Sequence, residues 1–228
     1  EGEISLRDFM CEVSERLSTS NRVLSAGQEK EIIKNSKFTV DGFAYLDNNG
    51  LSYRPVAVLD DLDQLPFPAY DLINLDSYLE SPYLYKSRSG IGQKSISMIT
   101  SRGCPYECVF CSISQHMGRK YRYHSPEYTL DHIEHIISTM GIKNFHFEDD
   151  NLTLHRRHFR RILNGILERD IDIAWDTPNG IRADSLNRDT MKLMKKAGAK
   201  VLQIAIESGN ETVLNDIIKK DSKIAPYY

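Results

Sequence analysis

From residue 95 onward, the sequence alternates short, apolar, β-rich runs with longer runs whose apolar residues recur three and four positions apart. The short runs are SISMIT, KNFHFE, DIAWDT and KVLQIAIES. Each pair of runs takes about 30 residues, the length of a strand and the helix that leads to the next parallel strand. We therefore predict an α/β fold, a partial (β/α) barrel with about four βα units, whose chemistry lies on the loops after the strands.

Capping residues indicate where the predicted helices end. Ser125 is the expected N-cap of the first helix, Pro126 its first residue and Gly141 its stop. Gly198 ends the third helix, and the run NETVLNDIIKK predicts a fourth. The last strand of such a partial barrel has an unpaired edge, which is a liability. We predict that the N-terminal segment, the end of the chain or a second copy in a dimer covers this edge.

The first 58 residues follow a different plan, a small α+β segment. One amphipathic helix is predicted by apolar residues at helical spacing, namely Leu6, Phe9, Met10, Val13 and Leu17. Cys11 lies among them, and we interpret it as a small buried hydrophobe. The run GFAYLDNNGLSYRPVAVL predicts two strands joined by a hairpin turn at residues 48–50. Residues 59–94, with prolines and several acids, are predicted to be a linker, and residues 95–228 the first part of the barrel.

Composition narrows the class of protein. Of 228 residues, 40% are hydrophobic and 27% charged, which is ordinary for a globular chain with a core. A net charge of −3 disfavours a general nucleic-acid or membrane-surface binder, and no apolar run approaches the roughly 18 residues of a membrane span. The opening EGEISLRDFM lacks a starting Met, so we interpret it as the cut end of a longer protein. Three of the four cysteines are clustered, which predicts a reducing, cytoplasmic location.

Cys104, Cys108 and Cys111 directly follow the first predicted strand, with the spacing C-x3-C-x2-C. Thiolates are soft ligands that suit zinc or an iron–sulfur cluster. A structural zinc site normally has four ligands, and the sequence has neither a second cysteine pair nor a histidine placed to complete one. A [4Fe–4S] cluster on three cysteines leaves one iron open to a reactant. We favour the cluster, and a non-catalytic zinc module with a water or a remote fourth ligand is the alternative.

The run Cys104-Pro-Tyr-Glu-Cys108-Val-Phe-Cys111 resembles the motif of the radical S-adenosylmethionine (SAM) superfamily. The resemblance implies that the three cysteines hold a [4Fe–4S] cluster whose open iron binds SAM. It implies reductive cleavage of SAM to methionine and a 5′-deoxyadenosyl radical, with an external electron donor of the flavodoxin or ferredoxin type. Phe110, just before the third cysteine, is then implied to line the adenine site.

Four further runs resemble one class within that superfamily: LDDLDQLPFPAYDL, HFEDDNLT, TPNGIRADSL and IAIESGNETVL. This is the cobalamin-dependent class, which includes methyltransferases and anaerobic magnesium-protoporphyrin IX monomethyl ester cyclases. The resemblance covers about residues 59–219 and implies a barrel of the radical SAM type. It implies that residues 1–58 are the tail of a cobalamin-binding domain, so we interpret the chain as an excised piece of a protein that uses cobalamin.

The resemblance also suggests SAM-binding residues at the ends of the later strands. Glu148 and Asp150 follow the second strand and are expected to bind hydroxyl or ammonium groups of SAM, or the substrate; capping the next helix is the alternative. Arg182 follows the third strand and can match a carboxylate in bidentate geometry, so we assign it to the SAM carboxylate. The alternative for Arg182 is an ion pair with Asp184.

Glu207 and Ser208 follow the fourth strand, and the resemblance suggests contact with the ribose or the methionine amine of SAM. A buried carboxylate without a partner is costly, so Glu207 should have one.

The run MGRKYRYHSP at residues 117–126 interleaves basic and aromatic residues. We expect it to brace the cysteine loop or to face an acidic cofactor group, rather than to bind nucleic acid. The remaining alternative is a structural fragment without cluster or activity.

Overall fold

The structure is a computed structural model, and it describes residues 2–18, 40–47, 50–55, 58–79 and 94–221. The chain forms two compact units, Glu1–Asp60 and Asp61–Tyr228. The predicted segment boundaries near residues 58 and 94 stay predictions. Within the described ranges, no helix combines the length and the apolar character that crossing a membrane requires.

The N-terminal unit contains the predicted helix and the predicted hairpin strands. α1 spans Glu3–Ser18, and β1 (Ala44–Asp47) pairs antiparallel with β2 (Gly50–Tyr53). The hairpin turn at residues 48–49 lies outside the described residues. The ring of Phe9 stacks on that of Phe43 with centroids 4.4 Å apart, which joins α1 to the chain just before β1.

The prediction of a buried Cys11 is wrong. Its thiol is free and exposed, and it lines a polar cleft of about 830 Å³ within the N-terminal unit. Asp8 and Glu15, three positions before and four after it, line the same cleft. Residues at these spacings share one face of a helix, so Cys11 belongs to the polar side of α1.

The second unit is built on a four-stranded parallel sheet. Its strand order is β3-β6-β7-β8, so consecutive strands of the βα units are neighbours in the sheet. The strands are β3 (Ser95–Met98), β6 (Asn144–Phe147), β7 (Ala174–Arg182) and β8 (Ala199–Ala205). The helices between them are α5 (Pro126–Met140), α6 (Arg156–Glu168) and α7 (Arg188–Lys196). The predicted partial (β/α) barrel is confirmed, and the described residues do not close it.

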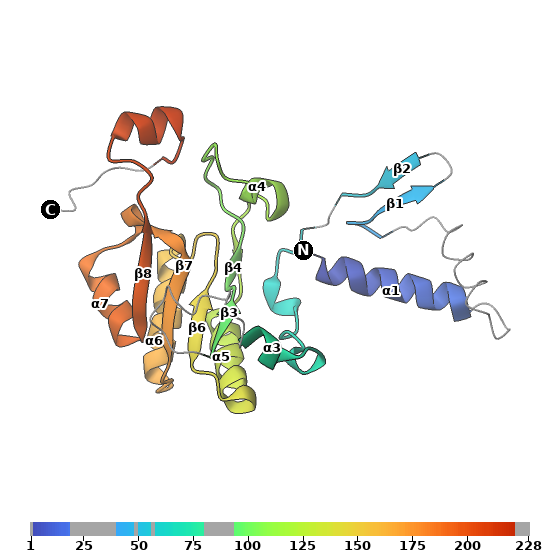
Figure 1. Cartoon of the computed structure of the whole chain (residues 1–228), viewed down its shortest axis with the longest axis horizontal. Helices are drawn as coiled ribbons and strands as arrows, with labels where there is room; N and C mark the ends of the chain where they lie inside the picture. The colour runs from blue at the N-terminus through green and yellow to red at the C-terminus, as the bar shows by residue number, and fades with distance from the viewer. Residues whose placement is uncertain (1, 19–39, 48–49, 56–57, 80–93, 222–228) are drawn as a thin grey trace. The chain divides into compact units, whose positions relative to one another are not determined.

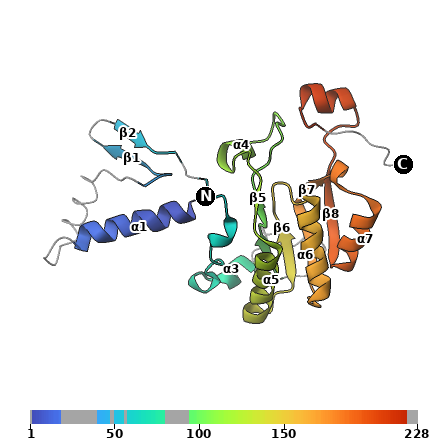
Figure 2. The ribbon, with the colours of Figure 1, turned by 180° about the vertical axis from the view of Figure 1, so that it is seen from behind.

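All three helices cover the same face of the sheet, with α6 packed between α5 and α7 (Figures 1 and 2). Trp175 of β7 is fully buried in the core between the two layers. Its ring meets the rings of Phe147 and Phe159 edge-on, and its Nε1 donates to the carbonyl oxygen of Ala197 at 2.7 Å. The helical layer therefore holds the strands rigidly and supports the loops at their ends.

The helix limits follow the predicted caps. The Ser125 hydroxyl accepts a hydrogen bond from the backbone N–H of Tyr128 at 3.0 Å, and Gly141 ends α5 at a φ of 66°. Asn187, which was not among the predicted caps, begins α7 by accepting from the N–H of Thr190 at 2.8 Å. These local interactions satisfy N–H groups that a helix leaves without intrahelical partners, which is why the sequence located the ends well.

The fourth helix is shorter than predicted. After Asn210, whose side chain accepts from the N–H of Val213 at 3.1 Å, the chain forms only a π-helical turn, η4 (Val213–Ile217). Lys219 then has a positive φ of 57°, which turns the chain back. As a result Lys220 is buried, and its tertiary contacts end the helix that the local pattern would have continued.

The face of the sheet opposite the helices carries a buried polar group that crosses three strands. His146 Nδ1 lies 2.6 Å from Asp176 Oδ1, and its Nε2 lies 2.7 Å from Ser95 Oγ. His146 and Asp176 are both buried. Buried polar groups need such partners, so these hydrogen bonds tie β3, β6 and β7 together at one level.

The segment before the sheet consists of short helical turns, η1 (Leu62–Gln64), η2 (Tyr70–Leu72) and α3 (Leu75–Leu79). Asp63 accepts a hydrogen bond from the N–H of Ser125 at 2.9 Å, at the start of α5. The ring of Phe67 stacks on that of His132, with centroids 4.6 Å apart, and the Tyr70 hydroxyl lies 3.1 Å from His132 Nε2. The histidine of α5 therefore anchors this segment.

These contacts predict acid sensitivity. Burial lowers the pKa of His132 to about 4, below the usual value near 6.5. The unfolded chain therefore binds a proton that the folded chain excludes, and the free energy of unfolding should fall as the pH drops from about 6.5 towards 4. His132→Phe keeps an aromatic ring and removes the titration, so denaturant unfolding across this pH range should show a shallower loss. The same change at exposed His135 is the control and should keep the wild-type slope; an unchanged slope in His132→Phe would contradict the prediction.

Candidate functional site

The three clustered cysteines lie on one loop that follows β3. β4 (Ser101–Arg102) pairs antiparallel with β5 (Arg122–Tyr123) and forms the base of this loop. Residues 103–121, here called the cysteine loop, lie between them and include the short helix α4 (Ile113–His116). The loop projects beyond the carboxyl ends of the strands, at the same end of the sheet as η4 (Figure 1). This is the side on which barrels of this kind carry their chemistry.

A close backbone approach shapes the base of the cysteine loop. Gly103 has a φ of +83°, and a Cβ atom there would lie 2.4 Å from the carbonyl oxygen of Lys120. The buried Arg122 donates to the carbonyl oxygens of Met117 at 2.6 Å and Lys120 at 3.3 Å. Within the basic and aromatic run at residues 117–126, Arg122 therefore braces the loop, as expected from the sequence.

Asp149, the second residue after β6, fixes the turn that leads into the cysteine loop. Its carboxylate is 2% exposed and accepts hydrogen bonds from the backbone N–H of Thr100 at 3.1 Å, from the Thr100 hydroxyl at 2.7 Å and from the Ser101 hydroxyl. Burial raises the pKa of Asp149 to about 6, although these hydrogen bonds act in the opposite direction. Asp149 thus holds the residues just before the cysteine loop, through one backbone N–H and two hydroxyl groups.

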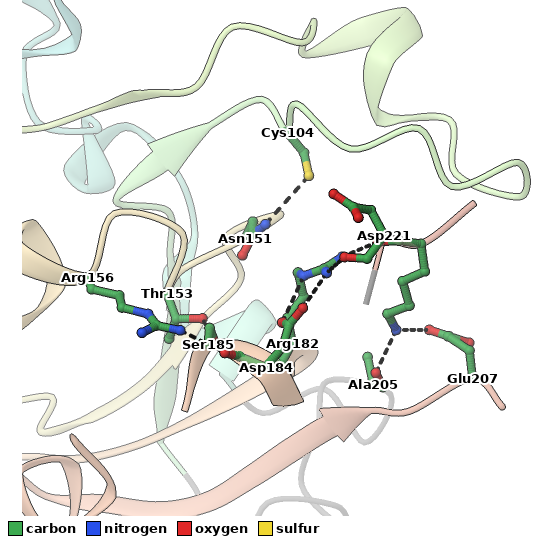
Figure 3. Close-up of polar contacts among 11 residues, drawn as sticks. Cys104, Asn151, Thr153, Arg156, Arg182, Asp184, Ser185, Ala205, Glu207 and Asp221 are labelled. Carbon is green, nitrogen blue, oxygen red and sulfur yellow. Dashed lines mark hydrogen bonds and ion pairs between the residues drawn. The ribbon is translucent and has the colours of Figure 1, made fainter. Parts of the chain in front are cut away.

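The next two residues continue the contact along the loop. The Asp150 carboxylate accepts from the backbone N–H of Gly103 at 3.2 Å, and burial raises its pKa. The Asn151 side chain is buried, and its Nδ2 lies 3.6 Å from the sulfur of Cys104 (Figure 3). Residues 149–151 therefore contact successive parts of residues 100–104, in the same order along the chain. We call these three residues the β6 clasp.

Glu148 occupies a different place from the β6 clasp. Its carboxylate accepts a hydrogen bond from the Ser97 hydroxyl at 2.7 Å, and its carbonyl oxygen accepts from the Asn179 amide at 2.7 Å. Glu148 therefore links β3, β6 and β7 above the polar group around His146. Asp150 faces the cysteine loop, so the structure separates two acids that the sequence had grouped together.

The three cysteines are free thiols and differ in exposure. Cys104 and Cys108 are half-buried, and Cys111 is exposed. The N–H of Cys111 donates to the carbonyl oxygen of Cys108 at 3.0 Å. Burial raises the pKa of the Cys108 thiol, and the charges of Arg182 and Lys220 oppose this shift. Two cations thus lie near the central cysteine.

In kind and number, these thiols fit a cluster bound by three cysteines. In the described part of the chain, however, no three His, Cys, Asp or Glu side chains are gathered closely enough to hold a metal ion. Holding a cluster therefore requires the cysteine side chains to converge. The stretch from Cys104 to Val109 has neither helix nor strand. The zinc alternative needs four ligands, and no such set of ligand side chains is gathered among the described residues either.

Arg182, at the end of β7, is heavily engaged within the chain. It forms a bidentate ion pair with Asp184, at 3.1 Å from Nε and 2.6 Å from Nη2. It also donates to the carbonyl oxygens of Lys220 and Asp221, each at 2.7 Å (Figure 3). Its guanidinium lies 3.7 Å from the ring centroid of Tyr106. The ion pair considered as the alternative is therefore present, beside the cysteine loop.

Glu207 and Ser208 lie beyond the end of β8. Glu207 has a positive φ of 65°, and its carboxylate lies 3.1 Å from Lys220 Nζ, which also donates to the carbonyl oxygen of Ala205 at 2.6 Å. Lys220 is thus the partner of Glu207, but Glu207 is exposed and Lys220 is the buried member of the pair, so the expectation of a buried carboxylate is wrong. The Ser208 hydroxyl accepts from the N–H of Asn210 at 3.1 Å and begins the turn towards η4.

Phe110 is 61% exposed, so its ring is free of the core. The preceding residue, Val109, donates its N–H to the carbonyl oxygen of Ile218 at 3.0 Å. This bond joins the cysteine loop to the segment after η4, the same segment that contacts Arg182. Cysteine loop, β7 end and β8 end thus meet at one place.

Two cavities lie at this meeting point. The larger, of about 590 Å³, lies between the cysteine loop at Tyr106 and the segment of residues 215–221. The smaller, of about 150 Å³, is lined by Tyr106, Asn151, Arg156 and Arg182, among others. Sequence reasoning did not select Tyr106, Asn151 or Lys220. The position of Tyr106 between the first two cysteines was a usable signal; Lys220 had none, because its burial depends on the turn at Lys219.

Comparison with known proteins identifies the family. Residues 98–225 match the Radical SAM superfamily. This chain belongs to the radical SAM superfamily. It is 32% identical to cytidylyl-2-hydroxyethylphosphonate methyltransferase of Streptomyces wedmorensis, over 75% of this chain and 32% of that protein. It is 24% identical to anaerobic magnesium-protoporphyrin IX monomethyl ester cyclase of Cereibacter sphaeroides, over 82% of this chain and 29% of that protein. The chain thus spans about a third of the length of such relatives.

Solved structures agree on the fold. A structure of the cobalamin-dependent SAM radical enzyme OxsB, with aqua-cobalamin and SAM bound, superposes with a TM-score of 0.67 at 22% identity, covering 98% of this chain and 29% of that chain. The radical SAM methyltransferase TsrM from Kitasatospora setae, with tryptophan substrate and a SAM analog bound, gives a TM-score of 0.60 at 16% identity, covering 87% and 39%. The radical SAM chain described here therefore has the fold expected from its sequence.

The base of the cysteine loop offers a test with a matched control. Gly103 and Gly118 both have positive φ, but only at Gly103 would a Cβ meet backbone. Alanine costs roughly 1–2 kcal/mol at either site through backbone strain. We expect Gly103→Ala to cost clearly more than Gly118→Ala in denaturant unfolding, and to increase protease cleavage within residues 103–121. Equal costs for the two variants would contradict this account of the loop base.

Proposed function

We propose that this chain is the core of a radical SAM enzyme in which Cys104, Cys108 and Cys111 hold a [4Fe–4S] cluster. The observation that carries the proposal is the C-x3-C-x2-C spacing on the loop after β3, within the span that matches the superfamily. When bound, the reduced cluster supplies one electron to the sulfonium of SAM, which yields methionine and a 5′-deoxyadenosyl radical. An external donor of the flavodoxin or ferredoxin type would supply that electron to the protein.

The chain's own residues would position the cluster and SAM. The β6 clasp holds the start of the cysteine loop, and Arg122 holds its end, so the loop is fixed at both sides of the thiols. Burial raises the pKa of the Cys108 thiol, and the positive charges of Arg182 and Lys220 offset part of that rise. Phe110, exposed on the same loop, is available to pack against adenine.

For the remaining SAM contacts we propose the roles that the family resemblance implies. Arg182 would pair with the carboxylate of SAM, and this requires at least one of its present acceptors to give up a hydrogen bond. Asp150 and Glu148 would bind hydroxyl or ammonium groups from the β6 side. Glu207 and Ser208 would bind the ribose or the amine from the β8 side, after Glu207 exchanges its bond to Lys220.

We further propose that the full-length protein uses cobalamin and carries out methyl transfer or oxidative cyclisation. The support is the similarity to a methyltransferase and to a cyclase, together with the shared fold of OxsB, whose structure contains cobalamin. The N-terminal unit would then be the tail of a cobalamin-binding domain. The substrate would be selected by parts of the protein beyond this barrel segment.

The outer edge of β8 supports a proposal about assembly. Among the described residues no strand pairs with this edge, and Val201, Ile204 and Ile206 are exposed along or just after the strand. An unpaired edge with apolar side chains favours pairing with a further strand. We propose that the N-terminal segment, the end of the chain or a second copy covers it, and the oligomeric state in solution distinguishes a second copy from the other two.

Removal of one cysteine tests the proposal. After anaerobic reconstitution with iron and sulfide, the wild-type protein should absorb broadly at about 400 nm and form 5′-deoxyadenosine from SAM. Cys108→Ala should lose both properties and keep its circular dichroism spectrum. Cys11→Ala, in α1, is the control and should keep both. A colourless wild-type protein that binds zinc would support the metal-binding alternative, and one that binds neither would be a structural fragment.

The role of Arg182 is separable from that of its ion pair. Arg182→Gln should weaken SAM binding roughly ten- to hundredfold while iron and sulfide content stays at the wild-type level, because a charged hydrogen-bond partner of the carboxylate is lost. Asp184→Asn removes the ion pair but keeps the guanidinium, so it should retain most of the affinity. Isothermal titration with SAM on reconstituted protein measures both. Wild-type affinity in Arg182→Gln would leave Arg182 with a structural role only.

A further inference from the structure

The side-chain amide of Asn151 is aimed at the first cysteine of the loop. Its Nδ2 lies 3.6 Å from Cys104 Sγ, and the residue is 4% exposed (Figure 3). Distances of this size are normal for hydrogen bonds to sulfur, which is a large and weak acceptor. Asn151 lies four residues beyond the end of β6 and Cys104 lies in the cysteine loop, so this contact joins two segments that are distant in sequence.

Hydrogen bonds fix the backbone on both sides of this contact. The backbone carbonyl oxygen of Asn151 accepts from the N–H of Leu154 at 3.2 Å, which closes a turn just after the β6 clasp. The Asp150 carboxylate accepts from the N–H of Gly103, the residue before Cys104. The backbones that carry the donor and the acceptor are therefore held by separate hydrogen bonds, and the Asn151 side chain is itself buried. A buried side chain on a fixed backbone has few positions open to it, so the donor is preorganised.

We propose that Asn151 is a positioning residue that donates an N–H···S hydrogen bond to the Cys104 thiolate and thereby raises the reduction potential of the bound cluster. This inference rests on the proposed function, because it requires a cluster on Cys104. A hydrogen bond to a ligand sulfur stabilises negative charge, and the reduced cluster carries one more negative charge than the oxidised one. The bond therefore stabilises the reduced form more. Surrounding hydrogen bonds are a recognised means by which a protein sets a metal centre's properties.

A purely structural role for Asn151 makes a different prediction. In that case, its replacement would lower the stability of the turn or the yield of cluster, but the potential of the clusters that do form would not move. The reduction potential therefore separates the two roles. Activity does not, since it would fall in either case.

The test uses the reconstituted full-length holoprotein. Asn151→Leu removes the donor at similar size, and Asn151→Asp keeps the shape while replacing the amide with a carboxylate. Asn144→Leu is the control, because Asn144 lies at the opposite end of β6 and its amide donates at 2.9 Å to the backbone carbonyl oxygen of Lys94, just before β3. Each variant is poised at the wild-type midpoint potential. The reduced fraction is read by electron paramagnetic resonance, and iron and sulfide content and thermal melting are measured on the same samples.

We expect a severalfold fall in the ratio of reduced to oxidised cluster in Asn151→Leu, a larger fall in Asn151→Asp and no change in Asn144→Leu. A tenfold fall would equal a shift of about 59 mV for a one-electron couple. If Asn151→Leu does not fold, Asn151→Ala decides, because it removes the donor without adding the charge that Asn151→Asp places beside the cluster. A wild-type ratio in an Asn151 variant with full cluster content would overturn the inference and leave the proposed function standing. Failure of the wild-type protein to assemble a cluster would overturn the proposed function and the inference with it.

Discussion

A carboxylate removed from water needs hydrogen-bond donors, and Asp149 finds them in the turn between β3 and β4. Thr100 and Ser101 supply those donors, so the end of β6 and the start of the cysteine loop are held together. Asp150 and Asn151 extend the contact to Gly103 and Cys104. Because β3 and β6 pair in parallel, the turns that follow them lie at the same end of the sheet, where the strands have their carboxyl ends. The position of the first thiol therefore depends on a buried charge that never touches it.

The two faces of the sheet explain why the contact between the β6 clasp and the cysteine loop is rigid. On one face of the sheet, α5, α6 and α7 enclose an apolar core around Trp175. On the other face, His146 bonds to Asp176 and Ser95 across three strands. Apolar packing gives the sheet rigidity, while the polar group links the strands on the open side. The cysteine loop, whose backbone is irregular, is thus supported by a regular sheet and the helices packed on it.

The helices and strands were predictable because the signals for them are local. Ser125, Gly141 and Gly198 each act within a few residues, and the alternation of apolar residues fixes which side of an element is buried. The prediction failed where distant contacts compete with local ones. The run after Asn210 has a helical pattern, but burial of Lys220 against the end of β8 stops it early. The prediction also failed at Cys11. Cysteine is a residue type that is often buried, but Cys11 lies on the polar face of α1 and is exposed.

The sequence by itself determined the strand–helix order, the family and the placement of three thiols on one loop, since Cys104, Cys108 and Cys111 lie within eight residues of the chain whatever its fold. Only the tertiary structure decided the partners of the charged and polar side chains. Asn151 meets Cys104 across 47 residues, and Arg182 meets the carbonyl of Lys220 across 38. Such pairs depend on how parallel strands align their ends and how a buried turn directs one lysine. No pattern within a few residues of either partner carries that information.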